Sequence, residues 1–139
     1  MVAGMSVTDT SSAGCERCVM NLRLPYPPSV NNYLMHTPRG TFRTKAANAY
    51  RSVVAGLVVQ ELHMQPMLSG RLAVSIELTM PDRRKRDIDN AQKCLLDSLQ
   101  AAGVFRDDSQ IDFLQIRRLH VEPPGAADVC IEVIETEGE

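Results

Sequence analysis

The chain has 139 residues, a length typical of one domain, and its hydrophobic content of 44% is enough to build a buried core. No apolar run approaches the roughly 20 residues of a membrane span. Residues 1–20 also lack the basic start and apolar stretch of a signal peptide. These features argue against membrane and secreted proteins, and we expect a cytoplasmic one.

The formal net charge of −2 hides a strong segregation of charge along the chain. From Arg17 to Gln60 there are six cations and no anions, whereas residues 121–139 hold six anions and no cations. Residues 17–120 hold all 15 cations and nine anions, a net charge of +6. A basic body favours a polyanionic partner such as nucleic acid, although a solvated surface with an acidic tail would give the same pattern.

The first elements along the chain are predicted from composition and periodicity. We expect a disordered leader over 1–19, a domain over 20–135 and an acidic tail over 136–139. Residues 18–24 alternate as a short strand does, and residues 25–40 carry four prolines, which predicts a long loop. Residues 43–64 follow as a helix. Its expected apolar stripe consists of Ala46, Ala49, Tyr50, Val53, Val54 and Leu57.

The second half of the domain begins with a strand over 71–80, which alternates apolar and polar residues. Asp87 is a plausible side-chain N-cap for the next helix, and Gly103 is a natural C-terminal cap. Strands over 110–121 and 127–135 are joined by a turn at "EPPGA". The expected core stripe of the second helix is Ile88, Ala91, Leu95, Leu99 and Ala102. The order β-α-β-α-β-β predicts an α+β (mixed α/β) single domain, with a small mixed sheet packed by two helices.

The four cysteines give little sign of a metal site or a disulfide. Cys15 and Cys18 form a C-x-x-C pair, but a structural zinc site needs a second pair of ligands that the sequence lacks. Cys94 falls in the second helix and Cys130 in the last strand, so both are expected to be small core residues. We therefore predict that all four are plain thiols.

The stretch "MPDRRKRDIDNAQK" places four cations directly before two carboxylates, Asp87 and Asp89. Two carboxylates so close repel each other unless a cation lies between them, and Mg²⁺ takes carboxylate oxygens together with phosphates. Lys93 lies four residues after Asp89 on the same helical face, where it could stabilise charge. If the chain folds back after the helix, Asp107 or Asp108 can join the pair.

A purely structural interpretation is also open. Asp87 can be only a helix cap, Asp89 and Lys93 an ordinary surface pair, and Asp107 and Asp108 a turn. Under the functional interpretation, the carboxylates hold a metal and the cations hold phosphates around it. Those cations are Arg83, Arg84, Lys85 and Arg86.

The same residues carry a resemblance to a known family. The segment "MPDRRKRDIDNAQKCLLDSLQAAGVFRDDSQI" closely resembles the core of the RusA family of Holliday junction resolvases, and "LPYPPSVNNYL" is similar to that family's opening strand and loop. The similarity covers roughly residues 20–135. It implies a homodimeric, Mg²⁺-dependent endonuclease, with Mn²⁺ as a possible substitute, that cuts four-way DNA junctions by paired symmetric nicks in recombination and repair. It also implies a bacterial or prophage setting.

The resemblance assigns roles residue by residue. It implies that Asp87, Asp89 and Asp108 bind metal and that Lys93 is a catalytic lysine. It places the basic run 83–86 against DNA, and with it the loop residues Asn31, Asn32 and Tyr33. The two alternatives are a non-catalytic prophage relic that only binds junctions, and a nuclease for flaps or other branched DNA.

A homodimer is expected because a two-fold substrate is matched most simply by a two-fold enzyme. The sequence offers two surfaces for it. One is the set of apolar residues on the first helix, and the other is the free edge of the final strand. The helix residues are Leu57, Val58, Leu62 and Met64.

Overall fold

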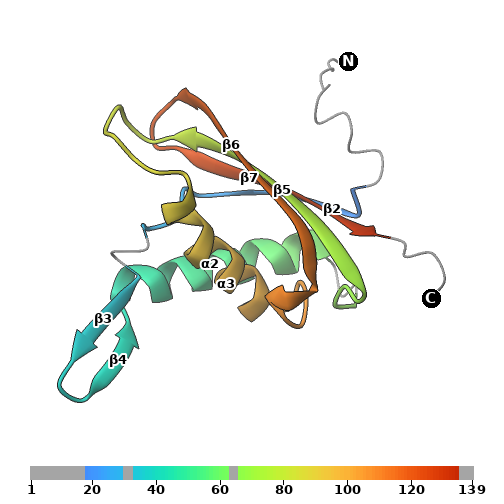
Figure 1. Ribbon diagram of the computed structural model, residues 1–139, viewed down its shortest axis with the longest axis horizontal. Helices are drawn as coiled ribbons and strands as arrows, with labels where there is room; N and C mark the ends of the chain where they lie inside the picture. The colour runs from blue at the N-terminus through green and yellow to red at the C-terminus, as the bar shows by residue number, and fades with distance from the viewer. Residues whose placement is uncertain (1–17, 30–32, 63–65, 135–139) are drawn as a thin grey trace.

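Figure 1 shows a computed structural model, which describes residues 18–29, 33–62 and 66–134. A four-stranded sheet is covered on one face by two helices, α2 (Lys45–Leu62) and α3 (Asp89–Ala101). A small separate hairpin projects from one end of this body. The arrangement confirms the predicted α+β single domain with a mixed sheet and two packed helices.

The sheet has the strand order β2-β7-β5-β6, where β2 is Met20–Leu24 and β7 is Ala126–Ile134. β7 runs antiparallel to both β2 and β5 (Arg71–Met80). β5 is parallel to the edge strand β6 (Ile111–Val121), and α3 makes the crossover between them. Ligand sites in open sheets of this kind lie outside the carboxyl ends of the strands, which here directs attention to the loop after β5.

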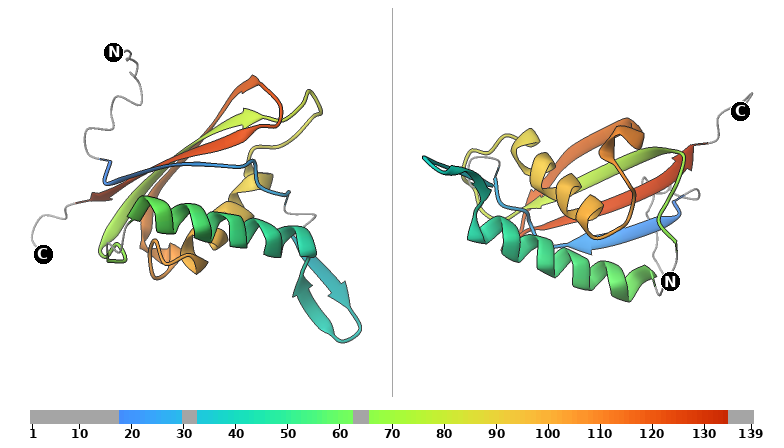
Figure 2. Two further views of the ribbon diagram at one scale, coloured as in Figure 1. Left: turned by 180° about the vertical axis from the view of Figure 1, so that it is seen from behind. Right: turned by 90° about the horizontal axis from the view of Figure 1, so that it is seen from below.

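The core lies between the sheet and the two helices (Figure 2). β5 alternates as predicted, because every second residue faces the helices and is buried. These buried residues of β5 are Leu72, Val74, Ile76, Leu78 and Met80. α3 contributes Ala91, Leu95 and Leu99 as predicted, with Ile88 and Ala102 partly buried at its two ends.

The stripe predicted for α2 is wrong by part of a turn. Ala46, Ala49 and Val53 are exposed, and the helix instead buries a set that overlaps the prediction only partly. The buried residues of α2 are Ala47, Tyr50, Val54 and Val58. This helix is apolar on more than one side, so its sequence does not decide which side faces the sheet.

The prediction that residues 25–40 form only a loop is also wrong. Two short strands, β3 (Leu34–Thr37) and β4 (Gly40–Arg43), pair antiparallel as a hairpin. The hydroxyl of Thr37 orders the two-residue turn, because it accepts a bond from the Arg39 N–H (3.2 Å) and donates to the Gly40 carbonyl (3.0 Å). The strands are short and mostly exposed on both sides, so they lack the alternation that signals a strand.

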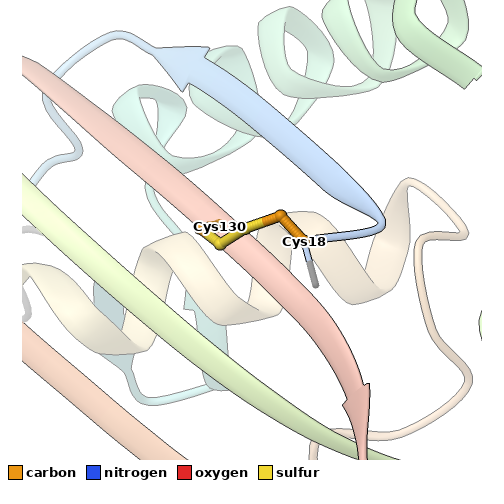
Figure 3. The surroundings of a disulfide bond; sticks show 2 residues. All are labelled: Cys18 and Cys130. Carbon is orange, nitrogen blue, oxygen red and sulfur yellow. A yellow bond between two sulfur atoms is a disulfide. The ribbon is translucent and has the colours of Figure 1, made fainter. Parts of the chain in front are cut away.

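The expectation of four plain thiols is wrong for two of them. Cys18 and Cys130 form a disulfide that joins the segment just before β2 to the middle of β7 (Figure 3). The two residues are 112 apart in sequence, and only the pairing of β2 with β7 brings their Cα atoms to 5.8 Å. Cys94 is a free, buried thiol as predicted, and Cys15 lies outside the described residues.

The structure contradicts one of the two dimer surfaces suggested by the sequence and a part of the other. β7 lies between β2 and β5 and has no free edge, and Val58 is 1% exposed. Met64 and the side chain of Leu62 lie outside the described part of the chain, as do the predicted leader up to residue 17 and the tail. None of the helices that the structure describes is long and apolar enough to cross a membrane.

Candidate functional site

The loop 81–88, between β5 and α3, carries the basic run and is braced from two sides. The guanidinium of Arg118 on β6 donates a hydrogen bond to the Arg86 carbonyl. Gly125 in the β6–β7 turn packs against Pro81, where a Cβ would come within 2.9 Å of the proline nitrogen. Because Gly125 also has a φ of +88°, a larger residue there would be strained and would push the start of the loop away.

Asp82 organises the basic run from inside the loop. Its carboxylate accepts hydrogen bonds from the Arg86 guanidinium (2.8 Å) and from the Arg84 N–H (3.0 Å). The Arg86 hydrogen bond is the main cause of the lowered pKa of Asp82, and Asp82 in turn raises the pKa of Arg86. The guanidinium of Arg86 also lies 5.7 Å from the centre of the Tyr26 ring, within cation–π range.

The four cations of the basic run therefore fall into two groups. Arg86 is partly buried and fixed, whereas Arg83, Arg84 and Lys85 are exposed. Exposed cations can meet phosphates without first losing a partner, although Arg84 has a loose contact with Asp82 at 3.8 Å.

A cleft of about 340 Å³ lies between this loop, the segment after β2 and the start of α3. Its lining residues are Tyr26, Ser29, Arg84, Lys85, Arg86, Asp87, Asn90 and Ala91. Burial raises the pKa of Tyr26, against the opposing effect of Arg86, so its phenol stays neutral at ordinary pH. The cleft thus joins cations, one carboxylate and neutral hydrogen-bonding groups.

Asp87 and Asp89 lie at the mouth of α3, but Asp87 is not the side-chain cap that we predicted. Ile88 occupies the N-cap position without a side-chain hydrogen bond, and only the backbone carbonyl of Asp87 accepts the N–H of Asn90 (3.2 Å). Asp87, Asp89 and Lys93 are all exposed. Within the described ranges, none of these three side chains has a hydrogen bond or an ion pair. The surface pair of Asp89 and Lys93 in the purely structural interpretation is therefore not formed.

Asp107 and Asp108 lie beyond the other end of α3, at the short 3-10 helix η3 (Asp108–Gln110). The Asp108 N–H donates to the side chain of Gln100 (3.2 Å), and the Asp107 carboxylate takes part in capping η3. Gln100 is eleven residues after Asp89, which corresponds to roughly 16 Å along a helix axis. The chain does not fold back, and nowhere in its described part do three His, Cys, Asp or Glu residues gather as a metal site would require.

The structure thus brings together part of the predicted set. Asp87, Asp89 and the basic run share one end of α3, with Lys93 one turn further along, and Asp108 lies at the other end. Asn31 and Asn32 lie outside the described residues, although Ser29, just before them, lines the cleft. Tyr33 was expected at the same DNA surface, but it is buried and its phenol donates to Asp97. The roles of Tyr26, Asp82 and Arg118 were not predicted from the sequence, because they depend on contacts between segments.

Comparisons with known proteins show the family to which the chain belongs. The family model described as endodeoxyribonuclease RusA matches residues 25–133. The chain is 34% identical to the crossover junction endodeoxyribonuclease RusA of Escherichia coli K12 over 111 residues, which cover 80% of this chain and 92% of the relative. It is also 34% identical to the proteins of that name from Enterobacteria phage 82, with the same coverage, and phage HK97, covering 81% and 93%. The chain therefore belongs to the RusA family of endodeoxyribonucleases.

Proposed function

We propose that this protein is a Mg²⁺-dependent endonuclease that resolves four-way DNA junctions by paired, symmetric nicks. The observation that carries the proposal is the pair of exposed carboxylates, Asp87 and Asp89, beside a basic cleft. Carboxylates whose role is to stabilise the fold would be expected in ion pairs. Carboxylates left without partners next to cations suit a site that binds a metal and a phosphate at once.

The cations supply the affinity for DNA. Arg83, Arg84 and Lys85 are exposed on the braced loop and would contact backbone phosphates. We also assign Asn31 and Asn32, which closely follow the cleft residue Ser29 in sequence, to DNA binding. Arg86 has a different part. Because it is held by Asp82 and stacked on Tyr26, it fixes the loop that presents the other three cations.

Asp87 and Asp89 are suitable ligands for Mg²⁺, because the ion prefers hard oxygen donors and commonly takes one or two carboxylates plus phosphate oxygens. When bound, it would supply a water of lowered pKa and neutralise charge that develops on the phosphate. Mn²⁺ has similar ligand preferences and is a possible substitute. Lys93, one turn beyond Asp89, would stabilise the same charge with its ammonium group.

The third predicted ligand, Asp108, requires a second copy of the chain. It is tied to the end of α3 opposite Asp89, so it cannot reach the same ion within one protomer. In a two-fold dimer with the α3 helices antiparallel, the Asp108 end of one protomer would meet the Asp89 end of the other. Such a dimer has two composite sites, which matches the two cuts that resolve a junction.

A cytoplasmic location, where DNA is accessible, is also part of this proposal.

The proposal is tested by incubating a labelled four-way junction and a linear duplex with the protein, with Mg²⁺ and with EDTA. We expect symmetric nicks on the junction only, and only with Mg²⁺. Binding without nicks would identify the non-catalytic relic. Preferential cutting of flaps would identify the other alternative, a nuclease for branched DNA.

A further inference from the structure

The β3–β4 hairpin has no role in the site described above, although its surface is unusual. Met35 and Phe42 are cross-strand partners and therefore share one face of the hairpin. They are 46% and 49% exposed, so the chain leaves a large apolar pair uncovered. The ring of Phe42 extends toward the turn, where a Cβ on Gly40 would lie 3.8 Å from its Cζ atom.

The charges that the hairpin itself carries are all positive. Arg39 lies at the turn and Arg43 on the opposite face of the hairpin, and there is no Asp or Glu anywhere from Arg17 to Gln60. A surface that binds another protein or a second copy of the chain has no need to exclude Asp and Glu. The combination of an exposed aromatic ring with cations is typical of surfaces that stack on bases and hold phosphates.

The hairpin also lies at the functional end of the molecule. In Figures 1 and 2 the hairpin projects from the end of the molecule that carries the loop 81–88 and the start of α3. Its base is fixed, because Tyr33 is 3% exposed and its carbonyl accepts the N–H of Thr44 (3.0 Å) across the two strands. The hairpin is thus a braced arm on the side of the molecule where DNA would bind.

We propose that the β3–β4 hairpin is a second DNA-binding element, which packs Met35 and Phe42 against bases left unstacked at the branch point of a junction. This proposal rests on the proposed function, since it assigns the hairpin to the same substrate. A linear duplex keeps its bases stacked inside the helix and offers the apolar pair nothing to contact. The hairpin would therefore contribute selectivity for branched DNA, and the basic run would contribute affinity for any DNA.

The experiment measures the Kd for a four-way junction and for a linear duplex with the same arms, in EDTA so that no strand is cut. Phe42→Ala is expected to weaken junction binding by about 5- to 150-fold, the effect typical of one stacked base, and to leave duplex binding within about twofold. Phe42→Tyr should bind both as the wild type does. Phe113→Ala is the matched control, because Phe113 is 50% exposed on the uncovered face of the sheet and should change neither Kd. Circular dichroism confirms that each variant folds.

Several results would overturn the proposal. If the wild type prefers junctions and Phe42→Ala does so equally, the hairpin proposal fails while the proposed function stands. Equal weakening on junction and duplex would make the hairpin a general backbone-binding element instead. If Phe42→Ala has a smaller mass than the wild type in light scattering, the apolar pair contacts a second copy of the chain instead of DNA. If the wild type has no preference for junctions, the proposed function and the hairpin proposal fail together.

Discussion

The phenol of Tyr33 donates a hydrogen bond to the carboxylate of Asp97 and thereby connects the base of the β3–β4 hairpin to α3. The same carboxylate forms an ion pair with Arg51 of α2, whose Nε atom is 3.4 Å away. Burial, together with this hydrogen bond, raises the pKa of Tyr33 above its ordinary value, so the phenol remains a donor. One cluster therefore sets the hairpin and the site helix relative to each other.

Tyr33→Phe removes only the donor and is expected to lower the free energy of unfolding by about 1 kcal/mol, the usual net value of such a bond. Urea denaturation measures it. Tyr26→Phe is the control, since the Tyr26 hydroxyl has no hydrogen-bond partner within the described ranges. Equal stability of Tyr33→Phe and the wild type would show that the bond contributes nothing net.

Neutralising the exposed cations tests the division of the basic run. The double variant Arg83→Gln/Lys85→Gln should bind junction and duplex more weakly, and its log–log salt dependence should be less steep by ~0.9 for each phosphate that is no longer neutralised. Its stability should not change. Arg86→Gln should instead lower stability as well, because Asp82 loses its partner. The division is wrong if both variants behave alike in denaturation and in salt titration.

Lys93→Ala is expected to lower the single-turnover nicking rate by about 100-fold, typical of removing one charge-stabilising group, with little effect on DNA binding. A lysine is not a metal ligand, so the Mg²⁺ concentration for half-maximal activity should stay the same. Lys93→Arg keeps the charge and should recover part of the rate. Normal turnover in Lys93→Ala would leave the residue as surface charge only.

The Cys18–Cys130 disulfide closes a loop of more than a hundred residues, so reduction should lower the free energy of unfolding by about 2–4 kcal/mol. Denaturation with and without dithiothreitol measures the effect. Cys18→Ser should match the reduced wild type and lose its response to the reductant, while Cys94→Ala should keep that response. Free Cys18 and Cys130 thiols in oxidised, purified protein would contradict the pairing.

The sequence predicted the elements whose periodicity is strict. β5 alternates over ten residues and α3 repeats apolar residues on one side only, so both were placed with their buried faces. α2 was placed as a helix, but its buried face was not, because apolar residues occur on several of its sides. The hairpin was missed because its strands are four residues each and bury no side chain.

The candidate site could also be predicted only in part from the sequence. Asp87, Asp89 and the basic run are neighbours in sequence, and any helix beginning there would bring them together. The position of Asp108 depends on its bond to Gln100 after a full helix, which spacing alone did not reveal. Asp82 and Tyr26 matter through their interactions with Arg86, and the disulfide depends on strand pairing across 112 residues.

Mixing two inactive variants tests the composite metal site most directly. Asp89→Asn and Asp108→Asn each remove one ligand charge and should each abolish nicking while leaving junction binding intact. When the two chains carry different tags and are co-expressed and purified through both, a dimer with shared sites contains one site with both substitutions and one with neither. The account predicts that this mixed dimer nicks one strand of the junction although neither parent does. A mixed dimer as inactive as its parents would contradict it.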